Sequence, residues 1–113
     1  MKKKLIVGNW KMNGGLQANA ELLQALLQGR PAPLNCGVGV AVPAVYLAQV
    51  HGLVDTAGIA VAAQDVSQHD KGAYTGEVSA SMLQDFDVRY VLVGHSERRQ
   101  YHGETDAVVA AKA

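Results

Sequence analysis

The sequence predicts an α/β fold in which short parallel strands alternate with helices. Three observations carry this prediction. Apolar runs without polar alternation recur along the chain, as in strands that are covered on both faces. Segments with apolar residues at helical spacing separate these runs, and glycines, prolines and capping residues mark the breaks. Units of this kind join by right-handed crossovers into a parallel sheet.

The first unit is a strand followed by a helix. Leu5-Ile6-Val7 is typical of a strand buried on both faces, and Asn13-Gly14-Gly15 breaks it. Five leucines then recur at helical spacing: Leu16, Leu22, Leu23, Leu26 and Leu27. Gly29, Pro31 and Pro33 indicate where this helix stops.

The second unit repeats the pattern, and a third strand follows it. The apolar run Val38 to Val42 ends at Pro43. Val45, Leu47 and Val50 then predict a short helix that ends near Gly52. Residues 59–63 form the third predicted strand.

The rest of the chain continues the alternation. A polar loop is expected over residues 64–76, and a short helix that contains Met82, Leu83 and Phe86 follows it with Ser79 as its cap. Residues 90–93 predict the fourth strand, and residues 94–103 a further loop. Thr105 is the expected N-cap of a last helix that reaches Lys112.

Two architectures fit this order, a doubly wound open sheet and an arc of a (β/α)8 barrel. A doubly wound nucleotide-binding domain usually has a Gly-rich phosphate turn after an early strand. Gly37-Val38-Gly39 lies inside the second strand instead, and Val42 occupies the position of the third glycine. Polar residues follow strands one, three and four, which in a barrel is the active-site face. The strand order distinguishes the two, because only a barrel arc keeps the order 1-2-3-4.

Composition limits the function classes. With 113 residues, 49% of them hydrophobic and 18% charged, the chain fits one small globular domain. Ten basic residues balance ten acidic ones, so no net charge draws nucleic acid or an anionic membrane. The single Cys36 cannot form an intramolecular disulfide, which favours a cytoplasmic location. The apolar run after the N-terminal lysines is too short for a signal peptide, and no run is long enough for a membrane span.

Two strand ends carry candidate chemistry. Lys11, with Asn9 beside it, is placed to meet an anion such as a phosphate, although a solvated loop lysine gives the same pattern. His95 follows the fourth strand and precedes a helical turn, where backbone amides disfavour a second proton. A neutral imidazole there could donate a hydrogen bond to an oxygen that gains negative charge, although a structural histidine fits equally well.

Other candidate sites are weaker. Ser96 is adjacent to His95, but adjacency does not provide the geometry of a nucleophile and its base. Glu97 and the two arginines after it could hold a phosphate or form an ion-pair network. The other histidines have no metal-ligand spacing with one another or with Cys36, so no metal and no other cofactor is expected. These histidines are His51, His69 and His102.

Three segments, in order and at matching strand ends, resemble the triosephosphate isomerase family. They are Asn9-Trp10-Lys11-Met12, Gly72-Ala73-Tyr74-Thr75-Gly76-Glu77-Val78-Ser79 and Gly94-His95-Ser96-Glu97-Arg98-Arg99. Ala63-Gln64-Asp65 is similar to the end of the family's third strand, with Asp65 where Asn is more usual. The match over residues 43–47 is looser.

The resemblance implies a fold and a reaction. It implies the first four βα units of a TIM barrel, with residues 1–113 as the N-terminal portion of one domain. The implied reaction of glycolysis and gluconeogenesis interconverts dihydroxyacetone phosphate and D-glyceraldehyde 3-phosphate through an enediolate. His95 matches the catalytic electrophile, Lys11 the catalytic cation that binds substrate, and Asn9 a further substrate-binding residue. Glu97 matches a carboxylate that contacts the substrate-binding residues rather than the substrate, and its expected role is to form ion pairs.

The resemblance also implies partners. Tyr74 and Thr75 match a loop that reaches into a second subunit, so a homodimer is expected. The family's catalytic glutamate, its lid and its phosphate-binding amides belong to later strands, and this chain contains none of them. We therefore expect a fragment that is inactive alone and needs the missing C-terminal half. The alternative is a non-catalytic half-barrel that serves as an assembly or interaction module.

Overall fold

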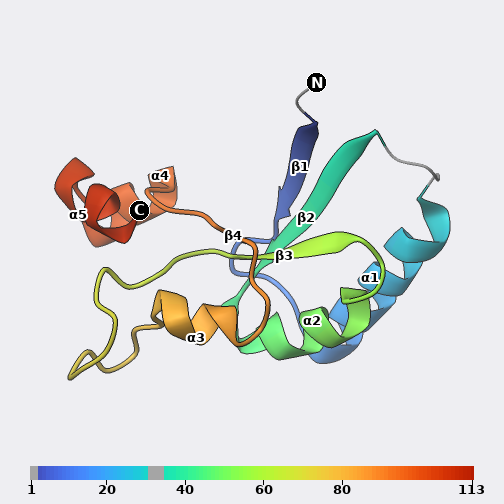
Figure 1. Cartoon of the computed structure of the whole chain (residues 1–113), viewed down its shortest axis with the longest axis horizontal. Coiled ribbons are helices and arrows are strands. Elements are labelled where there is room, and N and C mark those ends of the chain that lie inside the picture. Colours follow the sequence, from blue (N-terminus) through green and yellow to red (C-terminus); the bar gives the residue numbers. More distant parts are fainter. Residues whose placement is uncertain (1–2, 31–34) are drawn as a thin grey trace.

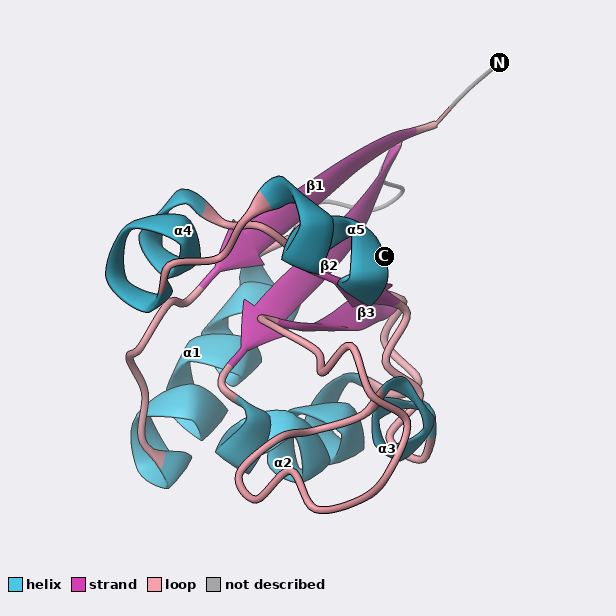
Figure 2. Ribbon diagram, turned by 90° about the vertical axis from the view of Figure 1, so that its left-hand side faces the viewer, coloured by secondary structure: helices cyan, strands magenta, loops and turns pink. Residues whose placement is uncertain are grey.

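The sheet has four parallel strands in sequential order. The structure, a computed structural model, describes residues 3–30 and 35–113. Its strands, in the spatial order β1-β2-β3-β4, are β1 (Lys4–Asn9), β2 (Cys36–Val42), β3 (Ile59–Ala63) and β4 (Tyr90–Val91). The sheet is curled like half of a barrel (Figures 1 and 2). The order does not reverse, so the barrel arc is confirmed and the doubly wound sheet is excluded.

The helices gather in two groups. Along one side of the sheet lie α1 (Leu16–Gly29), α2 (Leu47–Val54), which follows the 3₁₀ turn Ala44–Tyr46, and α3 (Ala80–Gln84) (Figures 1 and 2). The last two, α4 (Ser96–His102) and α5 (Asp106–Lys112), lie apart from α1 and α2 at the left of Figure 1. The predicted caps are confirmed, because the hydroxyl of Ser79 accepts the amide of Met82 and that of Thr105 accepts the amide of Val108.

Several predicted boundaries were wrong. A helix, α4, occupies most of the loop expected over residues 94–103, because the imidazole of His95 caps its first turn and Gly103 ends it at a φ of 66°. The second helix continues beyond Gly52 to Val54, while Phe86 lies outside α3. The fourth strand has two residues and not four. The predicted stop at Pro31 and Pro33 lies outside the described residues.

The core lies between the sheet and the helices α1, α2 and α3. Strand β2 is fully buried from Gly39 to Val42, and in β3 only Ala60 is partly exposed. Helix α1 contributes Leu23, and α2 contributes residues one turn apart. The buried members of the core are Leu23, Val40, Val42, Leu47, Val50, Val54, Ile59, Val61, Ala63, Val66 and Leu83. This core fixes the carboxyl ends of β2 and β3, from which the candidate site extends.

The prediction that the first strand is buried on both faces was wrong. Leu5 and Ile6 are 43% and 60% exposed. Strand β1 is an edge strand, since β2 is its sole neighbour among the described residues. Strand β4 likewise pairs with β3 alone in this part of the chain. An apolar sequence therefore does not guarantee burial in a strand that has one neighbour among the described residues.

Candidate functional site

The carboxyl ends of the strands form one wall of a cavity of about 530 Å³. The strand register aligns these ends, since Asn9 pairs with Ala41, and Val42 pairs with Ala63. The structure brings four of the candidate residues to this cavity, namely Asn9, Lys11, His95 and Glu97. They come from the ends of β1 and β4, so the cavity lies on the face that carries active sites in barrels.

Lys11 has an unusual backbone conformation. Its φ is 55°, a positive value that few residues other than glycine adopt. The side-chain oxygen of Asn9 accepts the Lys11 amide at 2.9 Å, and the carbonyl of Lys11 accepts the side-chain amide of Gln64 at 2.8 Å. The conformation is therefore held from both sides of the residue, which directs this lysine toward the cavity.

Gln64 was recognised in the sequence as a polar residue at a strand end, but no role was predicted for it. Its side-chain nitrogen also donates to the carbonyl of Ala41 at 3.0 Å. The amide therefore uses both hydrogens to join the loop after β1 to β2. No local motif indicates such a bridge, because its partners are 53 and 23 positions away in the sequence.

We expect Gln64→Met to loosen the Lys11 backbone while keeping the size of the side chain. The Lys11 carbonyl would lose this donor, whereas the Ala41 carbonyl would keep the Trp10 amide at 2.9 Å. We therefore expect the loss of a net hydrogen-bond contribution, about 0.5–1.5 kcal/mol. Urea unfolding should show a loss of free energy of unfolding in this range. Gln68 is exposed in the loop after β3, so Gln68→Met is the matched control and should change little. An equal loss in both variants would contradict the bridge.

His95 has a defined hydrogen-bonding pattern. Its Nδ1 accepts the backbone amide of Glu97 at 3.2 Å, while Oε1 of Glu97 lies 3.3 Å from the same nitrogen. An ion pair would require a proton on Nδ1, but the amide hydrogen already points at that nitrogen. The amide can only donate, so we assign Nδ1 as an acceptor and the ring hydrogen to Nε2. This arrangement leaves Nε2 available as a donor.

Glu97 links the two candidate catalytic side chains. Its Oε2 lies 3.5 Å from Nζ of Lys11. Both side chains of this pair are about half exposed, so the pair adds little to stability. Its effect is positional, since it places the lysine and the imidazole beside the same carboxylate.

A network of four charged side chains lies beside the cavity. Lys112 donates to Oδ1 of Asp65 at 2.8 Å and to Oε2 of Glu104 at 2.7 Å. Arg98 donates to the same oxygen of Glu104 at 2.6 Å and lies 3.2 Å from Asp65. Asp65 stands where the resemblance would place Asn, and its carboxylate contacts the cationic side chains of Lys112 and Arg98. The network attaches α4 and α5 to the end of β3.

The network shifts the pKa of its members. The hydrogen bond from Lys112 lowers the pKa of Glu104 below its ordinary value, burial opposes the shift, and the hydrogen bond from Arg98 adds to it. Burial acts to lower the pKa of Lys112, but hydrogen bonds to Asp65 and Glu104 outweigh it and raise that pKa. A lowered carboxyl pKa contributes stability above the ordinary value near 4.5, and this contribution is lost as pH falls through the lowered value.

We therefore expect the chain to lose stability in acid through Glu104. Thermal unfolding between pH 6 and pH 2.5 should show a falling midpoint in the unmodified chain. Glu104→Gln keeps the size but cannot ionise, so its midpoint should start lower at pH 6 and fall less steeply. Asp70→Asn, at an exposed loop position, is the control and should retain the original slope. Parallel curves for all three proteins would contradict the assignment.

Tyr74 and Thr75 do not line the cavity. Both are exposed on the long loop between β3 and α3. The ring of Tyr74 stacks on that of His69, with 3.8 Å between the ring centroids. The backbone carbonyl of Tyr74 accepts a hydrogen bond from the amide of Glu77. The loop is thus ordered by its own contacts while its tip stays open to solvent.

Among the described residues, no helix is both long and apolar enough to cross a bilayer.

Comparisons with known proteins identify the family of this chain. The family model "Triosephosphate isomerase" matches residues 4–113. The triosephosphate isomerase of Delftia acidovorans is 74% identical over 113 residues, which cover 100% of this chain and 46% of the relative. That of Paracidovorax citrulli is 73% identical over 114 residues, covering 99% and 45%, and that of Albidiferax ferrireducens is 61% identical, covering 100% and 45%. The chain spans a little less than half the length of these relatives. It belongs to the triosephosphate isomerase family.

Proposed function

We propose that this chain supplies the electrophilic part of a triosephosphate isomerase active site. The complete site would interconvert dihydroxyacetone phosphate and D-glyceraldehyde 3-phosphate through an enediolate. One observation carries the proposal. Lys11 and His95 line the same cavity, and the amide of Glu97 leaves His95 with a free Nε2 donor.

The chemistry of these side chains suits an enediolate. When a base removes the proton next to a carbonyl, negative charge develops on the carbonyl oxygen. A neutral imidazole can donate its Nε2 hydrogen to that oxygen, and an ammonium group can stabilise the same charge as well as the substrate phosphate. Asn9 supports both roles of Lys11, because its side-chain oxygen accepts a hydrogen bond from the backbone amide of Lys11. These donors are ordered before substrate binds, so little reorganisation is needed at the moment of reaction.

The base is proposed to come from the family's later strands. Glu97 is the carboxylate nearest to both electrophiles, but it is engaged with Lys11 and lies beside His95. We assign it to positioning of these side chains and not to proton abstraction. On this proposal, residues 1–113 are the N-terminal portion of a single barrel domain whose closure adds the base, the lid and the phosphate-binding amides.

We propose further that the active protein is a cytoplasmic homodimer. The exposed tip with Tyr74 and Thr75 supports an intersubunit contact, since this loop is ordered without using its outer surface. The free thiol of Cys36 supports a reducing compartment. The proposed reaction uses no cofactor.

A non-catalytic interaction module is the second candidate. The open edges of β1 and β4 favour it, because such edges are templates for pairing with another chain. Barrel closure would use the same edges. The two candidates differ in activity, since only the isomerase proposal requires Lys11 and His95.

The test is Lys11→Met in the enzyme assembled from this chain and the remaining segment of the Delftia acidovorans relative. Removing a cation that stabilises developing charge should lower kcat/KM at least about 100-fold. Lys71→Met, in the exposed loop after β3, is the matched control and should keep the original rate. Equal rates in the two variants would refute the assignment of Lys11.

A further inference from the structure

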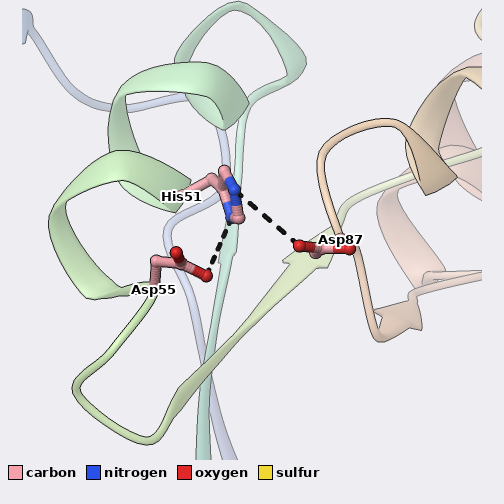
Figure 3. Close-up of side chains that lie close together, drawn as sticks. All are labelled: His51, Asp55 and Asp87. Carbon is pink, nitrogen blue, oxygen red and sulfur yellow. Dashed lines mark ion pairs between the residues drawn. The ribbon is translucent and has the colours of Figure 1, made fainter.

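We propose that His51, Asp55 and Asp87 form a binding site for a divalent transition-metal ion of the zinc type. Figure 3 shows the three side chains converging, with both carboxylates directed at the imidazole. One ligand atom from each residue lies within 4.8 Å of the other two. The site is independent of the proposed isomerase function, because none of the three residues lines the cavity with His95. It also revises the expectation of no metal, which considered only the spacing among histidines and Cys36.

Two structural elements supply the ligands. His51 lies in the last turn of α2, and Asp55 is the residue that caps this helix four positions later. Residues four apart lie on the same face of a helix, so these two side chains form one side of the site. Asp87 comes from the connection between α3 and β4, where its φ of 53° is a left-handed value that aspartate tolerates. This turn brings the third ligand toward α2.

Each carboxylate lies near a different nitrogen of the imidazole, and neither contact is a hydrogen bond. Nδ1 of His51 lies 3.9 Å from Oδ1 of Asp55, and Nε2 lies 3.8 Å from Oδ2 of Asp87. Hydrogen bonds between nitrogen and oxygen measure about 2.7–3.2 Å, so neither contact is one. Two ligand atoms each about 2.1 Å from a tetrahedral ion are about 3.4 Å apart. One ligand atom from each residue lies within 4.8 Å of the others. Rotation of the exposed Asp55 and Asp87 side chains would therefore bring both carboxylates to an ion bound at a single nitrogen of His51.

The local charges favour a cation. Asp55 and Asp87 form no ion pair with a lysine or arginine in residues 3–30 and 35–113. While His51 is neutral, the two carboxylates therefore flank its ring without a compensating cation. An adjacent hollow of about 610 Å³, lined by all three residues, gives an ion access from solvent. Arg89 also lines this hollow, but it makes no ion pair with either carboxylate.

The donor set selects the class of metal. One imidazole with two carboxylates suits zinc and its transition-metal neighbours, whereas magnesium and calcium prefer oxygen ligands alone. Three protein ligands leave at least one position for water. The Asp87 side chain is 76% exposed and that of His51 27%, so the ligands are not rigidly held and the affinity should be moderate.

The test is titration of the untagged chain with zinc chloride by isothermal calorimetry, in a Cys36→Ser background that removes the competing thiol. We expect one saturable site, and we expect His51→Ala and Asp87→Asn each to weaken it at least tenfold. His102→Ala and Asp85→Asn are matched controls at exposed positions and should leave the affinity unchanged. Magnesium chloride should show no saturable binding.

Three outcomes would overturn the proposal. They are absence of saturable zinc binding at millimolar zinc, unchanged affinity in His51→Ala, and unchanged affinity in Asp87→Asn. Circular dichroism of each variant excludes misfolding as the cause of a loss. Asp87→Asn is the decisive variant in this respect, because an exposed aspartate-to-asparagine change should not disturb packing.

Discussion

The chain of residues 1–113 alone should show no triosephosphate isomerase activity above background. Its electrophiles polarise a carbonyl, but proton abstraction needs a positioned base, and general-base catalysis contributes about 10²–10⁴-fold. Mixing the chain with the remaining segment of the Delftia acidovorans relative should restore turnover. The open edges of β1 and β4 provide the pairing sites through which the two pieces can close a barrel.

His95→Gln in this chain should then depress the restored rate by about 10²–10³-fold, as expected for loss of one donor to the oxyanion. Glutamine keeps a polar side chain but not an imidazole whose tautomer the Glu97 amide sets. Association of the two pieces, followed by sedimentation velocity, should be unchanged. His102 lines the same cavity from the last turn of α4, so His102→Gln is the matched control and should retain the rate.

Two results would refute this account. One is robust turnover by the 113-residue chain, confirmed by mass spectrometry to be free of any C-terminal segment. The catalytic base would then lie among residues to which we assign only structural roles. The other is a restored rate that His95→Gln and His102→Gln lower equally, because that would separate His95 from the chemistry. The rates are compared as kcat/KM, which reports the loss of transition-state stabilisation.

The sequence predicted the strands and their order better than their burial. Apolar runs and glycine or proline breaks are local signals, and they located β2 and β3 closely. Burial depends on neighbours far away in the sequence, which is why Ile6 is exposed although its sequence context is apolar. The full extent of helix α4, where only a helical turn was expected, was missed for a related reason. Its cap is the imidazole of His95, a residue that the usual capping preferences do not include.

The candidate site was predictable as a set of residues but not as a geometry. Motifs at strand ends identified Asn9, Lys11 and His95, because parallel strands bring their carboxyl ends to one edge. The positive φ of Lys11 and its bridge to Gln64 depend on contacts between segments more than 50 residues apart, so no local pattern indicates them. The cluster around His51 was missed likewise, since Asp87 reaches it from a separate turn.

Thr75→Arg should convert the assembled enzyme from a dimer to a monomer. On the proposed homodimer, the tip of the loop after β3 enters a packed interface, where an arginine would bury a charge without a partner. Such a charge costs about 3–5 kcal/mol, and every 1.4 kcal/mol weakens association about tenfold, so the dimer dissociation constant should rise at least about 100-fold. Sedimentation velocity over a range of micromolar concentrations measures this shift.

Thr56 is also exposed but lies in the turn between α2 and β3, so Thr56→Arg adds the same charge elsewhere and should leave the dimer intact. An undisturbed dimer in Thr75→Arg would remove this loop from the interface, and equal dissociation in both variants would indicate a general effect of added charge.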